Sequence, residues 1–450
     1  MAFLERLNSV LSGAALPVVL IAVGAYLAVR LRLFYVFHPI KFVKDLKDAA
    51  KGEGTSPFKA LSIALAGTLG VGNISGVAAA ICAGGAGAVF WMWVSALAAM
   101  SVKYAEVALA VKYRRVRESG GKKEYYGGAM YYIKDGLSKH VGKKAGIFLA
   151  AFFALLLVTN SLITGNIVQV NAVASVWENT PRILWGVIIG ISVLAVVVGG
   201  VKRIGDFTVL AIPFLSAVYI ALSMYIILSN AASVPLIFEE IIGNAFSMKA
   251  AGGGVLGYGV TRAVRFGVTR GIFSNEAGCG TAPTSHASAN TKSPHHQGCF
   301  GIFEVFCDTI VLCTMTAVVI LMADIKGLDG IPLSVASYGA FGGQIAEWII
   351  GVSVVVFALA TVICQEYYGI EALSYFSPSP LLRRLYIALS FAATLVGSVM
   401  SASLMWQIAD LEIALMTVIN TLVVFILSDE VVKERRARGV APHPTNKRLH

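Results

Sequence analysis

A glycine-rich stretch from Ala66 to Gly87, AGTLGVGNISGVAAAICAGGAG, constrains this chain more than any other feature. It has the length and apolar flanks of a membrane-spanning helix, but glycines recur through its middle and favour a break there. A broken helix exposes unpaired amides and carbonyls, which a membrane protein tolerates only where protein or a water-filled cavity receives them. The stretch therefore predicts a helix that is interrupted in mid-membrane at a ligand site.

The composition places the whole chain in a membrane. Of its 450 residues, 57% are hydrophobic and 14% are charged, and the mean hydropathy is +0.76. These values are far too apolar for a soluble protein. The six cysteines lie in or beside apolar segments without the paired spacing of a zinc site or a disulfide framework, so we interpret them as packing residues.

Apolar runs of about 20 residues, the length that spans a bilayer, recur along the chain. They lie near 13–33, 59–83, 86–110, 146–175, 182–200, 207–229, 252–288, 298–322, 343–373, 383–400 and 404–427. The first run is not a cleavable signal sequence, because its basic residues follow the apolar stretch instead of preceding it. We expect an all-α polytopic membrane protein with eleven transmembrane helices.

Lysine and arginine are divided very unequally between alternate loops. Twenty-eight fall in the loops of one side and in the C-terminal tail, whereas four fall on the opposite side. Because cytoplasmic loops carry an excess of basic residues, we expect a cell-membrane protein with its N-terminus outside and its C-terminus in the cytoplasm. The net charge of +11 is then a topology signal, with binding of anionic lipids by the loop Lys112–Lys144 as the alternative.

Without the first helix, two sets of five helices remain, and each set begins with an interrupted segment. Five crossings insert the second set upside down relative to the first, as in the inverted repeats of secondary transporters. The second segment, Gly252–Pro283, is rich in glycine, although such glycines also serve helix packing alone. The expected organisation is an accessory helix (1–36), an inner loop (37–58), two five-helix repeats (59–230 and 231–428) and a basic cytoplasmic tail (429–450).

Five blocks of sequence resemble the alanine/glycine:cation symporters, which are also called sodium:alanine symporters. The blocks are GTLGVGNISGVAAAICAGGAGAVFWMW (67–93), KYAEVALAVKYR (103–114), GNIVQVNAVA (165–174), RFGVTRGIFSNEAGCGTAP (265–283) and EYYG (366–369). The resemblance extends over essentially the whole chain. It implies a five-plus-five inverted repeat whose two broken helices cradle an amino acid, with a sodium ion between the first and eighth helices of the repeat.

The resemblance and the chemistry of a zwitterion together indicate a substrate site. Amides at a helix N-terminus suit a carboxylate, and the first break offers them, whereas freed carbonyls of the second break are implied to hold the ammonium group. Gln169 extends a polar stripe on an apolar helix, and its alternative role is hydrogen bonding between helices without ligand contact. The predicted substrate-binding residues are Gly70, Val71, Gly72, Asn73, Gln169, Phe273, Ser274 and Gln365.

The resemblance also implies a sodium site made of oxygen ligands, which hard cations prefer. Carbonyls near Ala66 and Leu69, a carbonyl near Phe357 and the hydroxyl of Thr361 match that site. The residue before Thr361, often serine in the family, is Ala360 here, so one oxygen ligand is absent. Sodium is the predicted coupling ion and the only expected metal, and a proton is the alternative.

Two departures from the family pattern concern the substrate. Val71 replaces the usual threonine, and Gln365 stands where a tryptophan is usual. Loss of that tryptophan enlarges and polarises the pocket, which makes glutamine an alternative to alanine and glycine. Glu366 places an ionisable group deep in a span, where such groups are costly and typically functional, either for proton coupling or in a pair with a basic residue.

Other charges within the spans are interpreted mainly as structural. Lys103 and Glu106, three residues apart, can pair or snorkel, with closure of an inner gate as the alternative role. We expect Glu276 to accept backbone amides or pair with Arg270, and Asp308 to tie its helix to the second break. His295 and His296 are interpreted as solvated loop residues without metal-ligand companions. The candidate gating or coupling residues are Lys103, Glu106, Glu276, Asp308 and Glu366.

These features predict a transporter that imports small neutral amino acids of the alanine and glycine type by cation symport and alternating access. The alternatives are a proton-coupled carrier of glutamine and an amino-acid sensor that no longer transports. No paired-aspartate, HExxH or GxSxG arrangement of a catalytic site is present, so we do not expect an enzyme. We expect no organic cofactor, no nucleic acid and no obligate protein partner.

Overall fold

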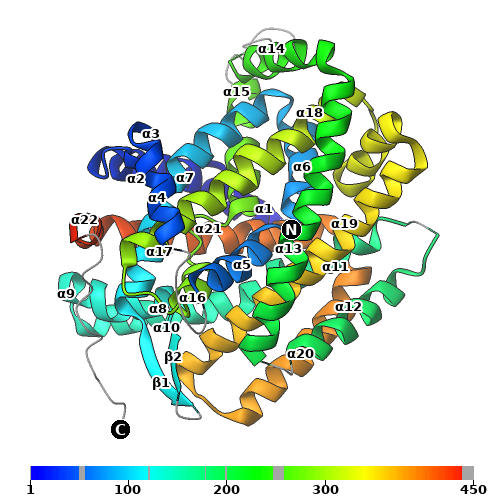
Figure 1. The fold of residues 1–450 in the computed structure, drawn as a ribbon. Coiled ribbons are helices and arrows are strands. Elements are labelled where there is room, and N and C mark those ends of the chain that lie inside the picture. Colours follow the sequence, from blue (N-terminus) through cyan, green and yellow to red (C-terminus); the bar gives the residue numbers. More distant parts are fainter. Residues whose placement is uncertain are drawn as a thin grey trace.

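The computed structural model describes residues 2–49, 56–119, 122–177, 179–197, 200–246 and 258–437, and these are helical almost throughout (Figure 1). The elements before residue 250 are α1 (Ala2–Val10), η1 (Leu11–Ala15), α2 (Leu16–Arg30), α3 (Phe34–Phe37), α4 (Pro39–Ala49), α5 (Pro57–Thr68), η2 (Val71–Asn73), α6 (Ser75–Gly84), α7 (Gly87–Tyr113), β1 (Arg115–Ser119), β2 (Lys122–Tyr126), α8 (Ala129–Tyr132), η3 (Ile133–Leu137), α9 (Ser138–Val141), α10 (Lys143–Leu162), η4 (Ile163–Ile167), α11 (Val168–Ala174), α12 (Arg182–Val197), α13 (Gly200–Ser229), η5 (Ala231–Ser233) and α14 (Val234–Ala245). The later elements are α15 (Tyr258–Asn275), α16 (Pro283–Ala287), α17 (Pro294–Val305), η6 (Phe306–Cys313), α18 (Thr314–Ala323), α19 (Gly330–Phe376), α20 (Pro380–Val399), α21 (Ala402–Ile426) and α22 (Ser428–Ala437).

Eight helical stretches in the described ranges are long and apolar enough to cross a membrane, and the bent pair of α5 and α6 makes a ninth. Each of the eleven apolar runs overlaps at least one helix. Two of them fail the length and composition test: α12 has only 16 residues, and α15 carries three arginines. The chain is thus an all-α, multi-pass membrane protein, and the number eleven stays a prediction.

Helices from the two halves of the sequence interlock. α7 packs against α15 and α17, α10 against α19, and α12 against α20, as their neighbouring ribbons in Figure 1 illustrate. α7 is the most enclosed of the candidate spans, with 83% of its apolar window buried. Its alanine-rich faces accept close neighbours, and Gly267 of α15 and Gly298 of α17 lie so near α7 that a side chain would not fit.

The long helix α19 contains a change of direction. Gly343 has φ 60° and ψ −159° inside it, which separates an N-terminal segment from the helix that follows. A positive φ of this kind favours glycine because the residue has no Cβ. The apolar run predicted at 343–373 begins at this kink.

The segments predicted to be an inner loop and a tail contain helices. The segment 37–58 includes α4, and the tail begins with α22. α22 is joined to the end of α7 by Lys112, whose ammonium lies 2.9 Å from Glu430 Oε2 and 3.0 Å from Glu434 Oε1. The start of the basic tail is therefore part of the packed structure.

The loop after α7 forms an antiparallel hairpin of β1 and β2, in which Arg115 is opposite Tyr126. Arg114, which follows α7, donates hydrogen bonds to the carbonyls of Ala289 and Thr291. Its guanidinium also lies 3.9 Å from the centroid of the Tyr125 ring. These contacts connect the hairpin to the loop between α16 and α17.

Candidate functional site

The first helix break lies between α5 and α6. α5 ends at Thr68, the single turn η2 follows, and α6 begins at Ser75. The two helical parts are bent by 54° relative to each other, and Gly70 is extended, with φ −112° and ψ −152°. The break thus occurs among the glycines that predicted it.

Side chains from two other helices meet at Gly70. A Cβ atom on this residue would lie 2.6 Å from Thr361 Oγ1 and 2.9 Å from Gln169 Oε1, so only glycine allows both approaches. Gln169 Oε1 accepts a hydrogen bond from the amide of Val71 at 3.1 Å. Thr361 Oγ1 donates to the carbonyl of Ala66 at 2.9 Å. The predicted substrate and cation residues are therefore adjacent at this break.

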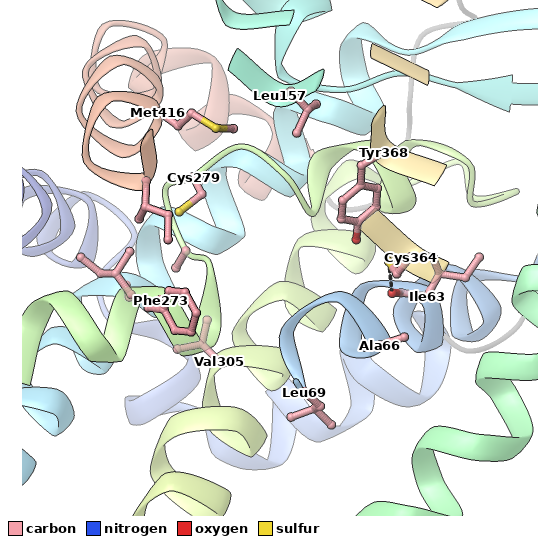
Figure 2. Packing of buried hydrophobic residues seen from close by; sticks show 14 of the residues in the cluster. Ile63, Ala66, Leu69, Leu157, Phe273, Cys279, Val305, Cys364, Tyr368 and Met416 are labelled. Atoms are coloured by element: carbon pink, nitrogen blue, oxygen red, sulfur yellow. Dashed lines mark hydrogen bonds between the residues drawn. The ribbon is translucent and has the colours of Figure 1, made fainter. Parts of the chain in front are cut away.

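The other two predicted cation residues also lie near the first break. Leu69 is the residue directly after α5, and Phe357 precedes Thr361 by one turn of α19; both are buried. One turn further along α19, Cys364 Sγ donates to the carbonyl of Ile63 at 2.9 Å (Figure 2). α19 therefore follows α5 up to the break and places its polar atoms against backbone carbonyls.

The second break separates α15 from α16. The chain leaves the helix after Asn275, and Glu276, Gly278 and Gly280 have φ values of 50°, 81° and 76°. The two breaks touch, because a Cβ on Gly72 would lie 2.9 Å from Ser274 Cα. Phe273 is buried against Trp406 of α21, with ring centroids 4.8 Å apart.

Asp308 on the π-helical segment η6 connects the two breaks. Its Oδ1 accepts hydrogen bonds from Asn73 Nδ2 at 2.6 Å and from Ser274 Oγ at 3.1 Å. All three residues are buried. π-Helical segments of this kind occur frequently at functional sites. The expectation that Asp308 ties its helix to the second break fits this geometry, and the tie to the first break is additional.

Glu276 and Gln365 contact each other at the second break. Gln365 Nε2 donates to Glu276 Oε1 at 2.8 Å, and Thr281 Oγ1 donates to Glu276 Oε2 at 2.6 Å. The expected pairing of Glu276 with Arg270 is wrong. Arg270 pairs instead with Asp410 of the neighbouring helix α21 at 2.7 and 3.0 Å.

Lys103 and Glu106 are fully buried on α7 and take separate partners. The Lys103 ammonium lies 3.1 Å from Glu304 Oε1 and donates to the carbonyl of Asn275 at 3.0 Å. His286 Nε2 contacts the other Glu304 oxygen at 3.2 Å. Lys103 therefore does not snorkel, because α17 supplies a carboxylate inside the protein.

The Glu106 carboxylate binds backbone amides that the second break leaves free. It accepts the amides of Gly278 and Gly280 at 3.3 and 3.2 Å, and Asn420 Nδ2 at 2.8 Å. Asn420 also donates to the carbonyl of Gly278 at 2.9 Å. Sequence reasoning did not identify Asn420, although an asparagine inside the apolar α21 was the available signal.

Freed carbonyls of the first break are also satisfied by hydroxyl groups that sequence reasoning did not identify. Thr316 Oγ1 donates to the carbonyl of Asn73 at 2.8 Å, and Ser334 Oγ donates to that of Ile74 at 3.1 Å. Both residues are buried on separate helices. Serine and threonine are common in membrane helices, so the residue type alone did not single out Thr316 and Ser334.

Glu366 lies apart from the two breaks. It lines a small pocket with residues of α12 and α20, among them Gly190, Val193, Ser390 and Thr394. The side chain is 2% exposed. Because Glu366 follows Gln365 directly, it faces roughly 100° away around α19. The structure therefore does not bring it together with the other predicted site residues.

Known proteins resemble this chain over most of its length. A family model described as the sodium:alanine symporter family matches residues 1–437. The sodium/alanine symporter AgcS of Methanococcus maripaludis is 36% identical over an alignment that covers 96% of this chain and 96% of AgcS. The probable sodium/glutamine symporter GlnT of Bacillus subtilis is 35% identical over 94% of this chain and 87% of GlnT.

A solved structure supports the fold. The crystal structure of MhsT in complex with L-phenylalanine superposes with a TM-score of 0.57 and 15% sequence identity, and the match covers 86% of this chain and 93% of MhsT. At this identity the likeness concerns the arrangement of helices alone. The family model and the relatives confirm the resemblance seen in the motifs: the chain belongs to the sodium:alanine symporter family.

Proposed function

We propose that this protein is a secondary active symporter that imports a small neutral amino acid together with a cation, sodium in the first instance, by alternating access. The contact between Gly72 and Ser274 carries the proposal, because it brings two interrupted helices together inside the protein. Paired interrupted helices of this kind form the binding sites of secondary transporters. Membership of the symporter family and the 36% identity to AgcS support the same function.

The substrate carboxylate is assigned to the amides of Gly70–Asn73, and the ammonium group to the second break near Phe273 and Ser274. Gln169 Oε1 already accepts the Val71 amide, so an incoming carboxylate would replace this side-chain oxygen with a charged acceptor, which makes a stronger hydrogen bond. The close approach at Gly72 leaves little room beside the substrate backbone and favours alanine or glycine.

The coupling cation is assigned to the carbonyls of Ala66, Leu69 and Phe357 and to the hydroxyl of Thr361. The hydroxyl and the carbonyl of Ala66 already lie 2.9 Å apart, so a sodium ion would gain two neighbouring oxygen ligands if the hydroxyl turned its hydrogen away. Oxygen ligands of this type suit a hard cation. Ala360 supplies no side-chain oxygen, so proton coupling remains the competing mechanism.

The proposed topology follows the distribution of basic residues. An accessory helix (1–36) precedes two inverted five-helix repeats (59–230 and 231–428), which gives eleven spans in the cell membrane. The N-terminus lies outside, and the loop 37–58 and the tail 429–450 lie in the cytoplasm. The interlocking of α7 with α15 and α17 is compatible with repeats that are related across the membrane.

Uptake into proteoliposomes tests the proposal. The purified protein should accumulate labelled alanine or glycine with saturation when an inward sodium gradient is imposed, and should not do so with potassium in place of sodium. Uptake that follows a proton gradient and ignores sodium would contradict the sodium assignment. Binding without uptake under any gradient would instead identify a sensor.

Glutamine is the second candidate substrate, because GlnT is 35% identical to this chain and Gln365 replaces the family's tryptophan. Unlabelled glutamine should then compete with labelled alanine in the same assay. Glu366→Gln tests the competing proton mechanism: if the carboxyl carries the coupled proton, the variant should lose the pH dependence of uptake, and if sodium is the coupling ion, the dependence on sodium should be unchanged.

A further inference from the structure

Away from the two breaks, the helices α4 and α17 lie side by side (Figure 1), and α17 packs on α7. Together α4 and α17 bring Asp45, His295 and Cys299 into one cluster. The interpretation of His295 as a solvated loop residue is wrong: α17 begins at Pro294, and His295 is 1% exposed. Cys299 is fully buried and lies four residues further along α17, so the two side chains share one face of the helix. Asp45 approaches that face from α4 and is 9% exposed.

The separations within this cluster are close to those around a tetrahedral metal ion. His295 Nε2 lies 3.2 Å from Asp45 Oδ2 and 4.0 Å from Cys299 Sγ, and the three ligand atoms all lie within 4.8 Å of one another. Zinc bonds to nitrogen, oxygen and sulfur of about 2.0 to 2.3 Å separate tetrahedral ligands by roughly 3.3 to 3.7 Å. One ion can therefore reach all three side chains after small rotations.

The histidine is held in the orientation that a metal ligand requires. Its second ring nitrogen, Nδ1, lies 2.8 Å from the hydroxyl of Tyr104. A neutral imidazole that binds metal through Nε2 carries its proton on Nδ1, and metal-binding histidines almost always donate this proton to a neighbouring group. Gly298 makes the contact possible, because a Cβ there would lie 2.8 Å from the Tyr104 ring.

The surroundings of the cluster are aromatic and largely closed to water. The rings of Phe34 and Tyr104 lie 5.5 and 5.8 Å from the His295 ring, and Tyr104 is fully buried. A site of low polarity strengthens the attraction between a cation and two anionic ligands. An ion bound here would therefore be held more tightly by these ligands than by the same ligands at a water-exposed surface.

We propose that Asp45, His295 and Cys299 form a binding site for one divalent transition-metal ion, with zinc as the best match, which fastens α4 to α17. One sulfur, one nitrogen and one oxygen donor select zinc or a similar metal over sodium, magnesium or calcium, which prefer oxygen ligands alone. Three protein ligands leave a fourth position for water. The site is independent of the transport proposal, because it shares no residue with the two breaks.

Titration with cobalt(II), which replaces zinc and absorbs visible light, tests the site. The full-length protein is purified without a polyhistidine tag, carries Cys82→Ser to remove an exposed thiol, and is treated with a chelator. We expect one cobalt per chain, a thiolate-to-cobalt charge-transfer band, and displacement of cobalt by zinc. Cys299→Ser should remove the band, and Asp45→Asn should weaken binding by about tenfold or more.

Two further variants separate metal binding from packing. His296→Ala changes the neighbouring histidine, which is outside the cluster, and should leave the titration unchanged. Tyr104→Phe removes the acceptor for the His295 Nδ1 proton and should weaken cobalt binding by about 10- to 100-fold. Zinc should also raise the unfolding temperature of the parent protein and of His296→Ala, but not that of Cys299→Ser.

Some results would overturn the proposal without relying on any variant that fails to fold. A parent protein that carries no stoichiometric zinc before chelator treatment, and shows no charge-transfer band when cobalt is added afterwards, has only a hydrogen-bonded cluster at this position. A band that persists at full strength in Cys299→Ser would place the metal on another thiol.

Discussion

The buried pair of Lys103 and Glu304 offers a sharp test of the packing around the second break. Both side chains are 0% exposed, their charged atoms lie 3.1 Å apart, and Lys103 also holds the last carbonyl of α15. Removing one member of a buried ion pair leaves a charge without its partner and typically costs about 3 to 5 kcal/mol. We therefore expect Lys103→Met to lower the free energy of unfolding by that amount.

The double variant Lys103→Met with Glu304→Gln should recover most of the loss. Glutamine removes the uncompensated charge and still offers a hydrogen-bonding group to His286, which contacts Glu304 at 3.2 Å. Replacing both members of a buried pair is often close to neutral, so the two substitutions should show a coupling energy of roughly 2 to 4 kcal/mol. The remaining loss reflects the carbonyl of Asn275, which has no lysine donor in either variant.

Equilibrium unfolding in mixed detergent and SDS micelles measures these differences. Lys326→Met is the matched control, because Lys326 pairs with Asp324 at the surface, with side-chain exposures of 83% and 74%, and should unfold like the parent protein. Two results would refute the reasoning. Lys103→Met could be as stable as the parent, or the double variant could be destabilised by the full sum of its two single substitutions.

Three further predictions concern the first break and the tail. Gly72→Leu should abolish uptake, because an added Cβ would lie 2.9 Å from the facing backbone. The control Gly243→Ala should transport normally, because an added Cβ there meets no atom within 4 Å. Uptake by a well-expressed Gly72→Leu variant would show that the glycine serves packing alone. Thr361→Val should raise the sodium concentration for half-maximal uptake by about tenfold, or ~1.4 kcal/mol, and Thr361→Ser should not; equal sodium dependence in all three proteins would remove the hydroxyl from the site. Burial opposes ionisation of Glu430, but hydrogen bonds that include one from Lys112 hold its pKa below 4.5. This carboxylate therefore stabilises the fold above pH 4.5, and its contribution is lost as the pH falls further. An acid-unfolding profile of Glu430→Gln that is identical to that of the parent protein would contradict this.

Sequence features that act locally predicted the fold well. The glycines of the first break predicted the change of direction found there, because a missing Cβ has its effect on the residue's own backbone. The kink at Gly343 in α19 was not predicted. Asp308 was placed at the second break for a similar reason, since an acidic side chain deep in an apolar run requires a nearby donor.

Partners that lie far apart in the sequence were harder to predict. The three-residue spacing of Lys103 and Glu106 suggested one pair, but α17 brings Glu304 closer to Lys103. Asp45 and His295 are 250 residues apart, so spacing rules for metal ligands did not detect them. The start of α17 was detectable, because Ser293 followed by Pro294 is a typical helix N-terminus, and in the structure Ser293 Oγ accepts the amide of His296.

The two breaks differ in how their backbone groups are satisfied, and this difference bears on the proposed orientation of the substrate. At the second break Glu106 supplies a carboxylate to the amides of Gly278 and Gly280, so a substrate carboxylate would gain little there and would meet a like charge. At the first break the Val71 amide donates to the neutral side chain of Gln169. A charged ligand exchanges a weaker hydrogen bond for a stronger one at this position. Asp308 lies at the Asn73 end of the first break and beside Ser274. The asymmetry therefore favours a carboxylate at the Gly70 and Val71 end of the first break, with the ammonium group near Asp308 and Ser274 on the side of the second break.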